Sequence, residues 1–273
     1  MTVALKAPTR PRHTEFAVIG KTVRPLFLEF FAGSGLVGHA LAPYFELAWA
    51  NDIAPDKASV FKANHHETLF QLGSITDVKG ADLPEAFLSW GSFPCQDLSV
   101  AGKAEGIRAK RSGLVWEWLR VIDELPSRPS VVVAENVVGL LSSASGANYR
   151  ELHDDLVKRG YKVGAMVLDA ERWVPQSRPR VFVVGVAEDI AISPELLDVG
   201  PNWAHTSAVV KVAANLDNWL WWKMPEPQSR QKTLFDIIEW DAPCFDEEKS
   251  QKTLALIPEP HIERLEKSGF PVF

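Results

Sequence analysis

The chain alternates short apolar runs with segments of helical periodicity from residue 26 to about residue 186. The runs are rich in Val, Leu, Ile and Phe, a composition typical of strands that are buried on both faces of a parallel sheet. This alternation predicts an α/β fold with a doubly wound, mostly parallel sheet, whose last two strands form an antiparallel pair. The expected strands are Leu26–Phe31, Phe45–Ala50, Leu69–Leu72, Ala86–Trp90, Val131–Ala134, Val163–Leu168 and Arg180–Val186.

Helix signals fall between these strands. The clearest is Leu114–Leu125, whose apolar residues share one helical face, with Ser112 as the expected N-cap and Pro126 after the end. Asn148 and Glu151 have the spacing of a capping box at the start of another helix. The other expected helices are Leu36–Ala42, Lys57–Asn64 and Tyr149–Arg159, with shorter candidates at Thr233–Trp240 and Ser250–Lys267.

The periodic pattern ends near Ala187. Residues 190–212 show no clear period, and a cluster of tryptophans, Trp219, Trp221 and Trp222, follows, which we expect to cap the core. The pattern predicts three parts: an N-terminal lead-in over residues 1–24, a catalytic domain over residues 25–189 and a C-terminal extension over residues 190–273.

Composition places the chain among ordinary globular proteins. Of its 273 residues, 46% are hydrophobic and 23% charged. No apolar run approaches the ~20 residues that span a bilayer, so we expect no membrane partner. The net charge of −6 argues weakly against a protein that coats nucleic acid non-specifically, although residues 103–111 contain a local basic strip.

The cysteines and histidines bear on the cellular compartment and on whether the chain has a metal site. Two cysteines, Cys95 and Cys244, do not make a disulfide framework and fit a reducing compartment, so we expect a cytoplasmic protein. His65 and His66 lie together but lack cysteine or carboxylate partners at ligand spacing. We therefore interpret both histidines as surface residues and expect no metal site.

A glycine-rich turn follows the first expected strand. Gly33, Gly35 and Gly38 form a G-x-G-x-x-G pattern that opens a helix, and Asp52 ends the next strand. Taken alone, this pattern matches the dinucleotide fingerprint and would indicate NAD chemistry. Glycines let a backbone approach a ligand closely, and an acidic residue can bind two ribose hydroxyls, so any adenosine-containing cofactor could use the arrangement.

Two further apolar runs end in reactive side chains. Cys95 follows the strand expected at Ala86–Trp90, and Glu135 follows Val131–Ala134. The ends of successive parallel strands face one crevice, so a thiol and a carboxyl group could work there on one substrate.

Four segments have the order and spacing of the DNA (cytosine-5) methyltransferase family: Phe31–Gly35, Phe93–Gln96, Glu135–Val137 and Gln176–Arg180. The chain resembles that family over roughly residues 26–186. The resemblance implies a Rossmann-like, S-adenosylmethionine-dependent methyltransferase fold. It also implies methyl transfer to C5 of cytosine in duplex DNA, in bacterial or phage DNA modification such as restriction–modification.

The resemblance assigns catalytic roles to four residues. Cytosine C5 is a poor nucleophile until something adds to C6, so Cys95 would add there as a thiolate. Glu135 would hold the edge of the base that carries N3 and the exocyclic amine, and would lend the base a proton as charge builds. Arg178 and Arg180 lie two apart and share one face, where guanidinium groups suit phosphate or a base carbonyl. The target base has to be flipped out of the duplex to reach these groups.

The resemblance also implies a pocket for S-adenosylmethionine. One departure is Ser74, which stands where the family usually has an aspartate for the adenine amine, and serine accepts a weaker hydrogen bond. The expected cofactor residues are Phe31, Ala32, Gly33, Gly35, Asp52, Ile53, Ser74, Ile75 and Pro94. The expected substrate residues are Gln96, Ser99 and Lys103 in a loop that closes on DNA, with Asn136 and Gln176 ordering their own loops.

Family members continue beyond the paired arginines with a target-recognition region and two closing motifs, and we find no match to either closing motif. We therefore expect a catalytic core that acts on double-stranded DNA, and leave open whether it works alone or with a complementing chain. A relative acting on transfer RNA is disfavoured because the chain has no Cys-Phe-Thr tripeptide. A nicotinamide-dependent dehydrogenase would leave Cys95, Glu135 and both arginines unexplained.

Overall fold

The computed structural model describes residues 23–94, 113–214, 216, 218–243 and 246–268. The chain divides into two compact units, Met1–Ser229 and Arg230–Phe273, and each is described by itself. The segments 95–112 and 244–245 contain both cysteines, so Cys95, Cys244 and the expected DNA-closing residues Gln96, Ser99 and Lys103 lie outside the described residues.

A seven-stranded sheet in the order β3-β2-β1-β4-β5-β7-β6 forms the first unit. Strand β7 runs antiparallel to both of its neighbours, β5 and β6, while the other pairs are parallel. The doubly wound sheet and its antiparallel final pair are therefore confirmed. The strands are β1 Leu26–Phe30, β2 Glu46–Asp52, β3 Phe70–Leu72, β4 Leu88–Gly91, β5 Val131–Val137, β6 Tyr161–Asp169 and β7 Pro179–Ala187.

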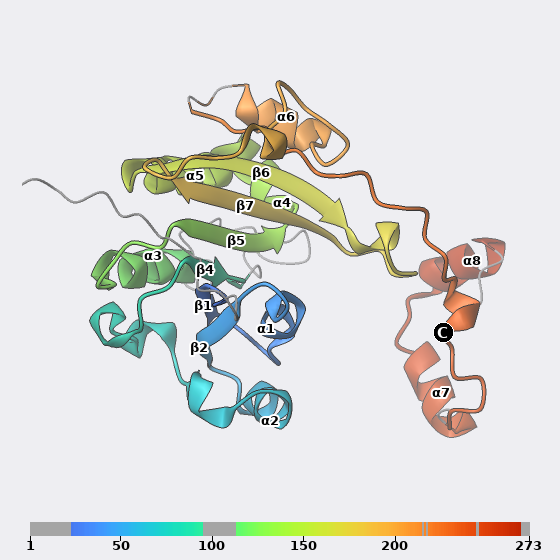
Figure 1. Cartoon of the computed structure of the whole chain (residues 1–273). Helices are drawn as coiled ribbons and strands as arrows, with labels where there is room; N and C mark the ends of the chain where they lie inside the picture. Colours follow the sequence, from blue (N-terminus) through green and yellow to red (C-terminus); the bar gives the residue numbers. More distant parts are fainter. Residues whose placement is uncertain (1–22, 95–112, 215, 217, 244–245, 269–273) are drawn as a thin grey trace, which may run out of the picture. The chain divides into compact units, whose positions relative to one another are not determined.

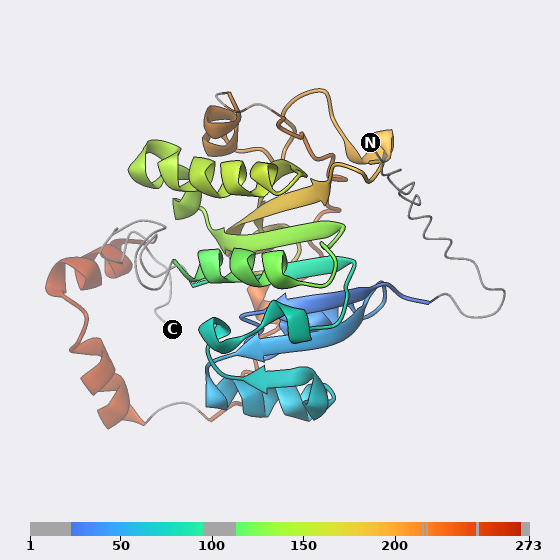
Figure 2. The same cartoon turned by 90° about the vertical axis from the view of Figure 1, so that its left-hand side faces the viewer.

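Helices cover both faces of this sheet. Figures 1 and 2 show α3 (Leu114–Glu124) and α5 (Ala147–Lys158) on one face, with α1 (Leu36–Leu41) and α2 (Pro55–Asn64) on the other. A short helix, α4 (Gly139–Ser142), connects β5 to α5.

The amphipathic face of α3 makes much of the core against the sheet. Val115, Trp118, Leu119, Val121 and Ile122 are all buried. The Trp118 indole N–H donates to the Ser89 hydroxyl at 3.0 Å, so the one polar atom of this buried ring is satisfied. This face of α3 therefore packs its largest residue onto β4, the strand that leads to the cysteine segment.

The expected capping box at the start of α5 is wrong. Gly146, in the left-handed conformation with φ +83°, occupies the N-cap position, and Asn148 lies inside the helix. The Asn148 amide donates to the Ser143 hydroxyl at 2.7 Å. A glycine that accepts positive φ here lets the chain turn sharply from the preceding 3-10 segment into the helix.

Residues 190–229 pack onto the same unit through one short helix, α6 (Ser207–Ala213), and the tryptophan cluster. Trp219 stacks on His153 of α5 with ring centroids 5.9 Å apart. Trp222 is buried in a cluster with residues of β6 and β7. These contacts agree with the expectation that the tryptophans cap the core.

The helices of the second unit differ from the two short helices that were expected there. Residues 233–240 contain only a 3-10 turn, Leu234–Asp236, closed by a capping box between Thr233 and Asp236. In place of one helix over Ser250–Lys267 there are two, α7 (Glu247–Leu254) and α8 (Glu259–Ser268). Pro258 separates them because proline removes a backbone donor and clashes with the preceding turn. No helix in the described ranges has the length and apolar character needed to cross a membrane.

Candidate active site

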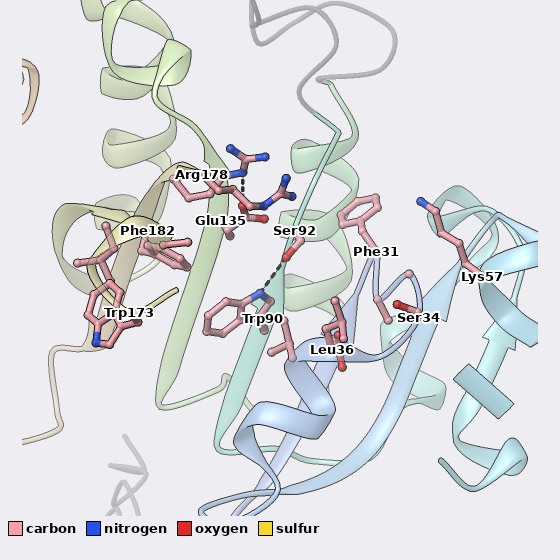
Figure 3. A pocket seen from close by; sticks show the side chains of 17 residues that line it. Phe31, Ser34, Leu36, Lys57, Trp90, Ser92, Glu135, Trp173, Arg178 and Phe182 are labelled. Atoms are coloured by element: carbon pink, nitrogen blue, oxygen red, sulfur yellow. Dashed lines mark hydrogen bonds and ion pairs between the residues drawn. The ribbon is translucent and has the colours of Figure 1, made fainter. Parts of the chain in front are cut away.

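The carboxyl ends of the parallel strands β1, β4 and β5 meet at one edge of the sheet and border a cavity of about 610 Å³ (Figure 3). The β6–β7 loop closes its far side. Volumes of ~300–1,000 Å³ are usual for small-molecule sites. The expected site residues that line this cavity are Phe31, Ala32, Gly33, Glu135, Arg178 and Arg180.

The glycine turn is held in an unusual backbone conformation. Phe31, Gly33 and Gly35 have positive φ angles of 57°, 55° and 81°, a region that only glycine adopts without cost. The Gly33 N–H donates to Asp52 Oδ2 at 2.8 Å, and the Ala32 N–H donates to the Asn51 carbonyl at 2.8 Å. The end of β2 therefore fixes the turn that forms one wall of the cavity.

Asp52 lies behind this turn and is 8% exposed. Its second oxygen, Oδ1, accepts from the Ala54 N–H at 2.9 Å, so one carboxylate organises two loops. Each carboxylate oxygen has two lone pairs, and both retain the capacity to accept from a ribose hydroxyl. The structure thus gives Asp52 a supporting role that the sequence did not predict, and its expected contact with ribose stays a prediction.

The other expected cofactor residues lie farther along the sheet edge. Ile53 is 69% exposed just beyond β2. The Ser74 hydroxyl accepts from the Thr76 hydroxyl at 2.8 Å. The Ile75 side chain is buried in the core, so only its backbone could meet a ligand. Gly35, Asp52, Ile53, Ser74, Ile75 and Pro94 do not line the cavity, and their contacts with a cofactor stay predictions.

An ion pair joins two of the expected catalytic residues across neighbouring strands. Arg180 Nε lies 3.0 Å from Glu135 Oε1, and both side chains are about one-fifth exposed, at 21% and 20%. Glu135 lies within β5, which extends three residues beyond the Val131–Ala134 run expected from sequence. Strand β5 continues to Val137 because β7 pairs with it along this length, with Val137 opposite Arg180.

Asn136 ties β5 to the segment that leads into Cys95. Its buried side-chain amide donates to the Phe93 carbonyl at 3.0 Å, while its side-chain oxygen accepts from the Val137 N–H at 2.8 Å. Both ends of the side chain are therefore occupied by backbone. This geometry suits a residue that orders the loop before Pro94.

The β6–β7 loop carries Arg178 into the cavity and is closed by a residue that the sequence analysis missed. Asp169 Oδ1 accepts from the Arg178 N–H at 2.7 Å and the Glu171 N–H at 3.1 Å, and Oδ2 accepts from the Ser177 hydroxyl at 3.1 Å. The Gln176 N–H bonds the Val174 carbonyl inside the same loop, and the Gln176 side chain is exposed. An aspartate at the end of a strand is a signal for such a turn.

Several cavity residues had no signal in the sequence motifs. Trp90 and Phe182 form an edge-to-face pair from β4 and β7, with centroids 6.0 Å apart, and Trp90 donates to the Ser92 hydroxyl at 2.9 Å. Lys57, at the start of α2, reaches the wall formed by Gly33. Their arrangement depends on strand order, which places residues from separate strands around one cavity. The described residues contain no group of three His, Cys, Asp or Glu side chains that could hold a metal ion.

Glu29 of β1 lines the cavity, and we expect its titration to make the free energy of unfolding depend on pH. Burial raises its pKa from 4.5 to about 7, against hydrogen bonds from the Gly38 and Val37 N–H groups. The unfolded chain loses this proton near pH 4.5 while the folded chain keeps it, so stability should fall as pH rises from 4.5 to 7. The free energy of unfolding of the wild type should fall by on the order of 3 kcal/mol over this range, and we expect no such fall in Glu29→Gln.

Urea unfolding at pH 5 and pH 8 measures this effect. Wild type should lose stability between the two pH values, and Glu29→Gln should lose much less. Glu46→Gln, on the exposed start of β2, is the matched control and should behave as wild type. Equal pH dependence in wild type and Glu29→Gln would show that this carboxyl is not the cause.

Comparison with solved structures defines the class of the fold. The chain is similar to a methyltransferase of Entamoeba histolytica, with a TM-score of 0.53 and 16% identity over 65% of this chain and 56% of that one. It is also similar to a putative DNA modification methyltransferase encoded within an Escherichia coli prophage, with a TM-score of 0.51 and 22% identity over 63% and 50%. The fold is that of the Rossmann-like methyltransferases.

Sequence comparison gives the family. The family model for C-5 cytosine-specific DNA methylases matches residues 26–262, and the chain belongs to this family. It is 28% identical to the type II methyltransferase M.BsuFI of Bacillus subtilis over 69% of this chain and 46% of that protein. It is 32% identical to the type II methyltransferase M.Bsp6I of Bacillus sp. (strain RFL6) over 57% and 50%. The chain thus spans about half the length of these curated relatives.

Proposed function

We propose that the chain transfers a methyl group from S-adenosylmethionine to C5 of cytosine in duplex DNA, through a covalent adduct with Cys95. The observation that carries the proposal is the Glu135–Arg180 pair, which borders the same cavity as the glycine turn. Strand β4, which leads to Cys95, lies between β1, which leads to the glycine turn, and β5, which carries Glu135, because β4 pairs with both. Two reactants could therefore meet at this edge.

Cys95 is the proposed nucleophile. Its thiolate adds to C6 of the flipped base, and the electron pair of the 5,6 double bond becomes available at C5. S-adenosylmethionine, when bound, supplies a methyl group on a positively charged sulfur. After C5 is methylated, loss of the C5 proton to a base and expulsion of the Cys95 thiolate restore the double bond. The bond between the methyl group and the donor sulfur breaks as the C5–methyl bond forms, which leaves the donor as a neutral thioether, and the cysteine is regenerated.

Glu135 and Arg180 are proposed to hold the base during these steps. A carboxylate can accept a hydrogen bond from the exocyclic amine of cytosine, and the adjacent guanidinium can donate to the base carbonyl. The ion pair at 3.0 Å keeps both side chains in place before the base arrives, which lowers the entropy cost of binding. Arg178 also lines the cavity, and we propose that it contacts a phosphate or the base.

The donor is proposed to bind at the glycine-turn end of the cavity. Phe31, Ala32 and Gly33 line this end, and the positive φ angles of the turn bring backbone close to a ligand. Trp90 offers an aromatic ring in the same cavity, and aromatic faces attract a cationic group such as a sulfonium. The residues present fit a ligand that is both adenosine-like and positively charged.

Calorimetry on the purified chain tests the choice of cofactor. We expect S-adenosylmethionine to bind and NAD not to bind under the same conditions. Binding of NAD alone would overturn the proposal in favour of a dehydrogenase. The names of the relatives, type II and orphan methyltransferases of bacteria and Bacillus phages, support a role for the proposed activity in bacterial or phage DNA modification.

A further inference from the structure

His65 contacts the glycine turn directly, which the sequence analysis did not predict. The residue ends α2, and its ring packs on buried Phe61 with centroids 4.6 Å apart. It is half-buried, so its interpretation as a surface residue is wrong. His66 next to it is exposed and bonds only locally among the described residues, to the Thr68 hydroxyl at 2.8 Å.

The contact is a hydrogen bond to the carbonyl of Gly35. His65 Nε2 lies 2.9 Å from this oxygen, and because a carbonyl only accepts, Nε2 is the donor. The same carbonyl accepts from the His39 N–H at 3.0 Å, the first hydrogen bond of α1. The His65 ring therefore bonds the junction between the glycine turn and the helix that the turn opens.

The fit between His65 and this junction is tight. A Cβ atom added to Gly35 would lie 2.7 Å from both the His65 and the Phe61 rings, and Gly35 has φ +81°. The opposite end of the turn is held by Asp52, whose carboxylate accepts from the Gly33 N–H. The turn is thus fixed at two points, by Asp52 at Gly33 and by His65 at Gly35.

We propose that His65 is a positioning residue for the donor site: its hydrogen bond holds the Gly35 end of the turn in the conformation that binds S-adenosylmethionine. The inference rests on the proposed function, because it assigns this turn to the donor. His65 itself lies outside the cavity lining, so it acts through the backbone of the turn. Without the bond, part of the binding energy would be spent on ordering the turn.

Three variants separate the hydrogen bond from packing. His65→Leu keeps an apolar side chain against Phe61 but removes the donor, and we expect S-adenosylmethionine affinity to fall by about three- to tenfold, the range for one lost hydrogen bond. His65→Gln restores a donor of similar reach and should recover most of that loss. His66→Leu is the matched control and should bind as wild type.

Two measurements make the outcomes distinct. Calorimetry gives the affinities, and amide hydrogen exchange of the ligand-free proteins reports whether the turn and the start of α1 open several-fold more often in His65→Leu than in wild type. Unchanged affinity and exchange in His65→Leu would overturn the inference and leave the proposed function standing. Equal weakening in His65→Leu and His65→Gln would also overturn it, since packing would then be the cause. A wild-type chain that does not bind S-adenosylmethionine would overturn both proposals.

Discussion

Cys95→Ala is expected to abolish covalent trapping on duplex DNA that contains 5-fluorocytosine, whereas the wild-type chain should form an adduct that survives denaturation. Fluorine at C5 replaces the proton that must leave, so the reaction stops with the cysteine sulfur still bonded to C6. Alanine has no nucleophile, and no adduct can form. Denaturing electrophoresis and intact-mass measurement of the protein–DNA product detect the difference, with S-adenosylmethionine present.

Cys244 provides the matched control, because it is the one other cysteine in the chain. Cys244→Ser should trap DNA as wild type does. An adduct that persists in Cys95→Ala and disappears in Cys244→Ser would show that the wrong sulfur was assigned. A wild-type chain that binds the donor but gives no adduct would favour the alternative of a catalytically incomplete core.

The sheet was predictable because its strands carry a strong local signal. Buried strands carry runs of β-branched residues, such as Val131–Val133 at the start of β5, and this signal does not depend on the rest of the chain. The antiparallel pairing of β6 and β7, which was expected for the last two strands, is confirmed. Strand ends were harder to place, because the extension of β5 to Val137 depends on pairing with a strand that is distant in the sequence.

The second unit shows the opposite case. Residues 250–267 have helical composition, but Pro258 divides them, and a local rule about proline would have given the break. Residues 233–240 have apolar positions at helical spacing, yet they make one turn only. Leu234, Phe235 and Ile237 remain exposed among the described residues, so little burial is available to offset the cost of ordering a longer helix.

Members of the site were predictable, but their contacts were not. Motif spacing placed Glu135 and Arg180 at one site, yet their ion pair requires β7 to lie between β5 and β6, which is a property of strand order. His65 and Asp169 act through backbone atoms of loops, and a single histidine or aspartate leaves no periodic pattern in a sequence. Residues that bind a ligand through side chains of fixed chemical type are therefore easier to find than residues that position them.

Glu135→Gln is expected to slow methyl transfer by about 10²- to 10⁴-fold, the range for losing one acid–base group. Glutamine keeps the size of the side chain and can still accept a hydrogen bond, but it carries no charge for Arg180 and cannot take or give the proton as charge builds on the base. Affinity for S-adenosylmethionine should be unchanged, because the expected donor residues that line the cavity, Phe31, Ala32 and Gly33, belong to the glycine turn and not to β5. Single-turnover transfer of a labelled methyl group to duplex DNA measures the rate.

Two further variants distinguish the loss of the Glu135 carboxyl group from a non-specific effect of substitution. Glu85→Gln, at an exposed position before β4, should match wild type in rate and in donor affinity. Arg180→Lys keeps a positive charge beside Glu135 but loses the planar fork of donors, so it should be slower than wild type while retaining the ion pair. If Glu135→Gln slows transfer by less than about tenfold, the carboxyl group is not an acid–base partner of the cytosine, and the pair with Arg180 would serve only to join β5 to β7.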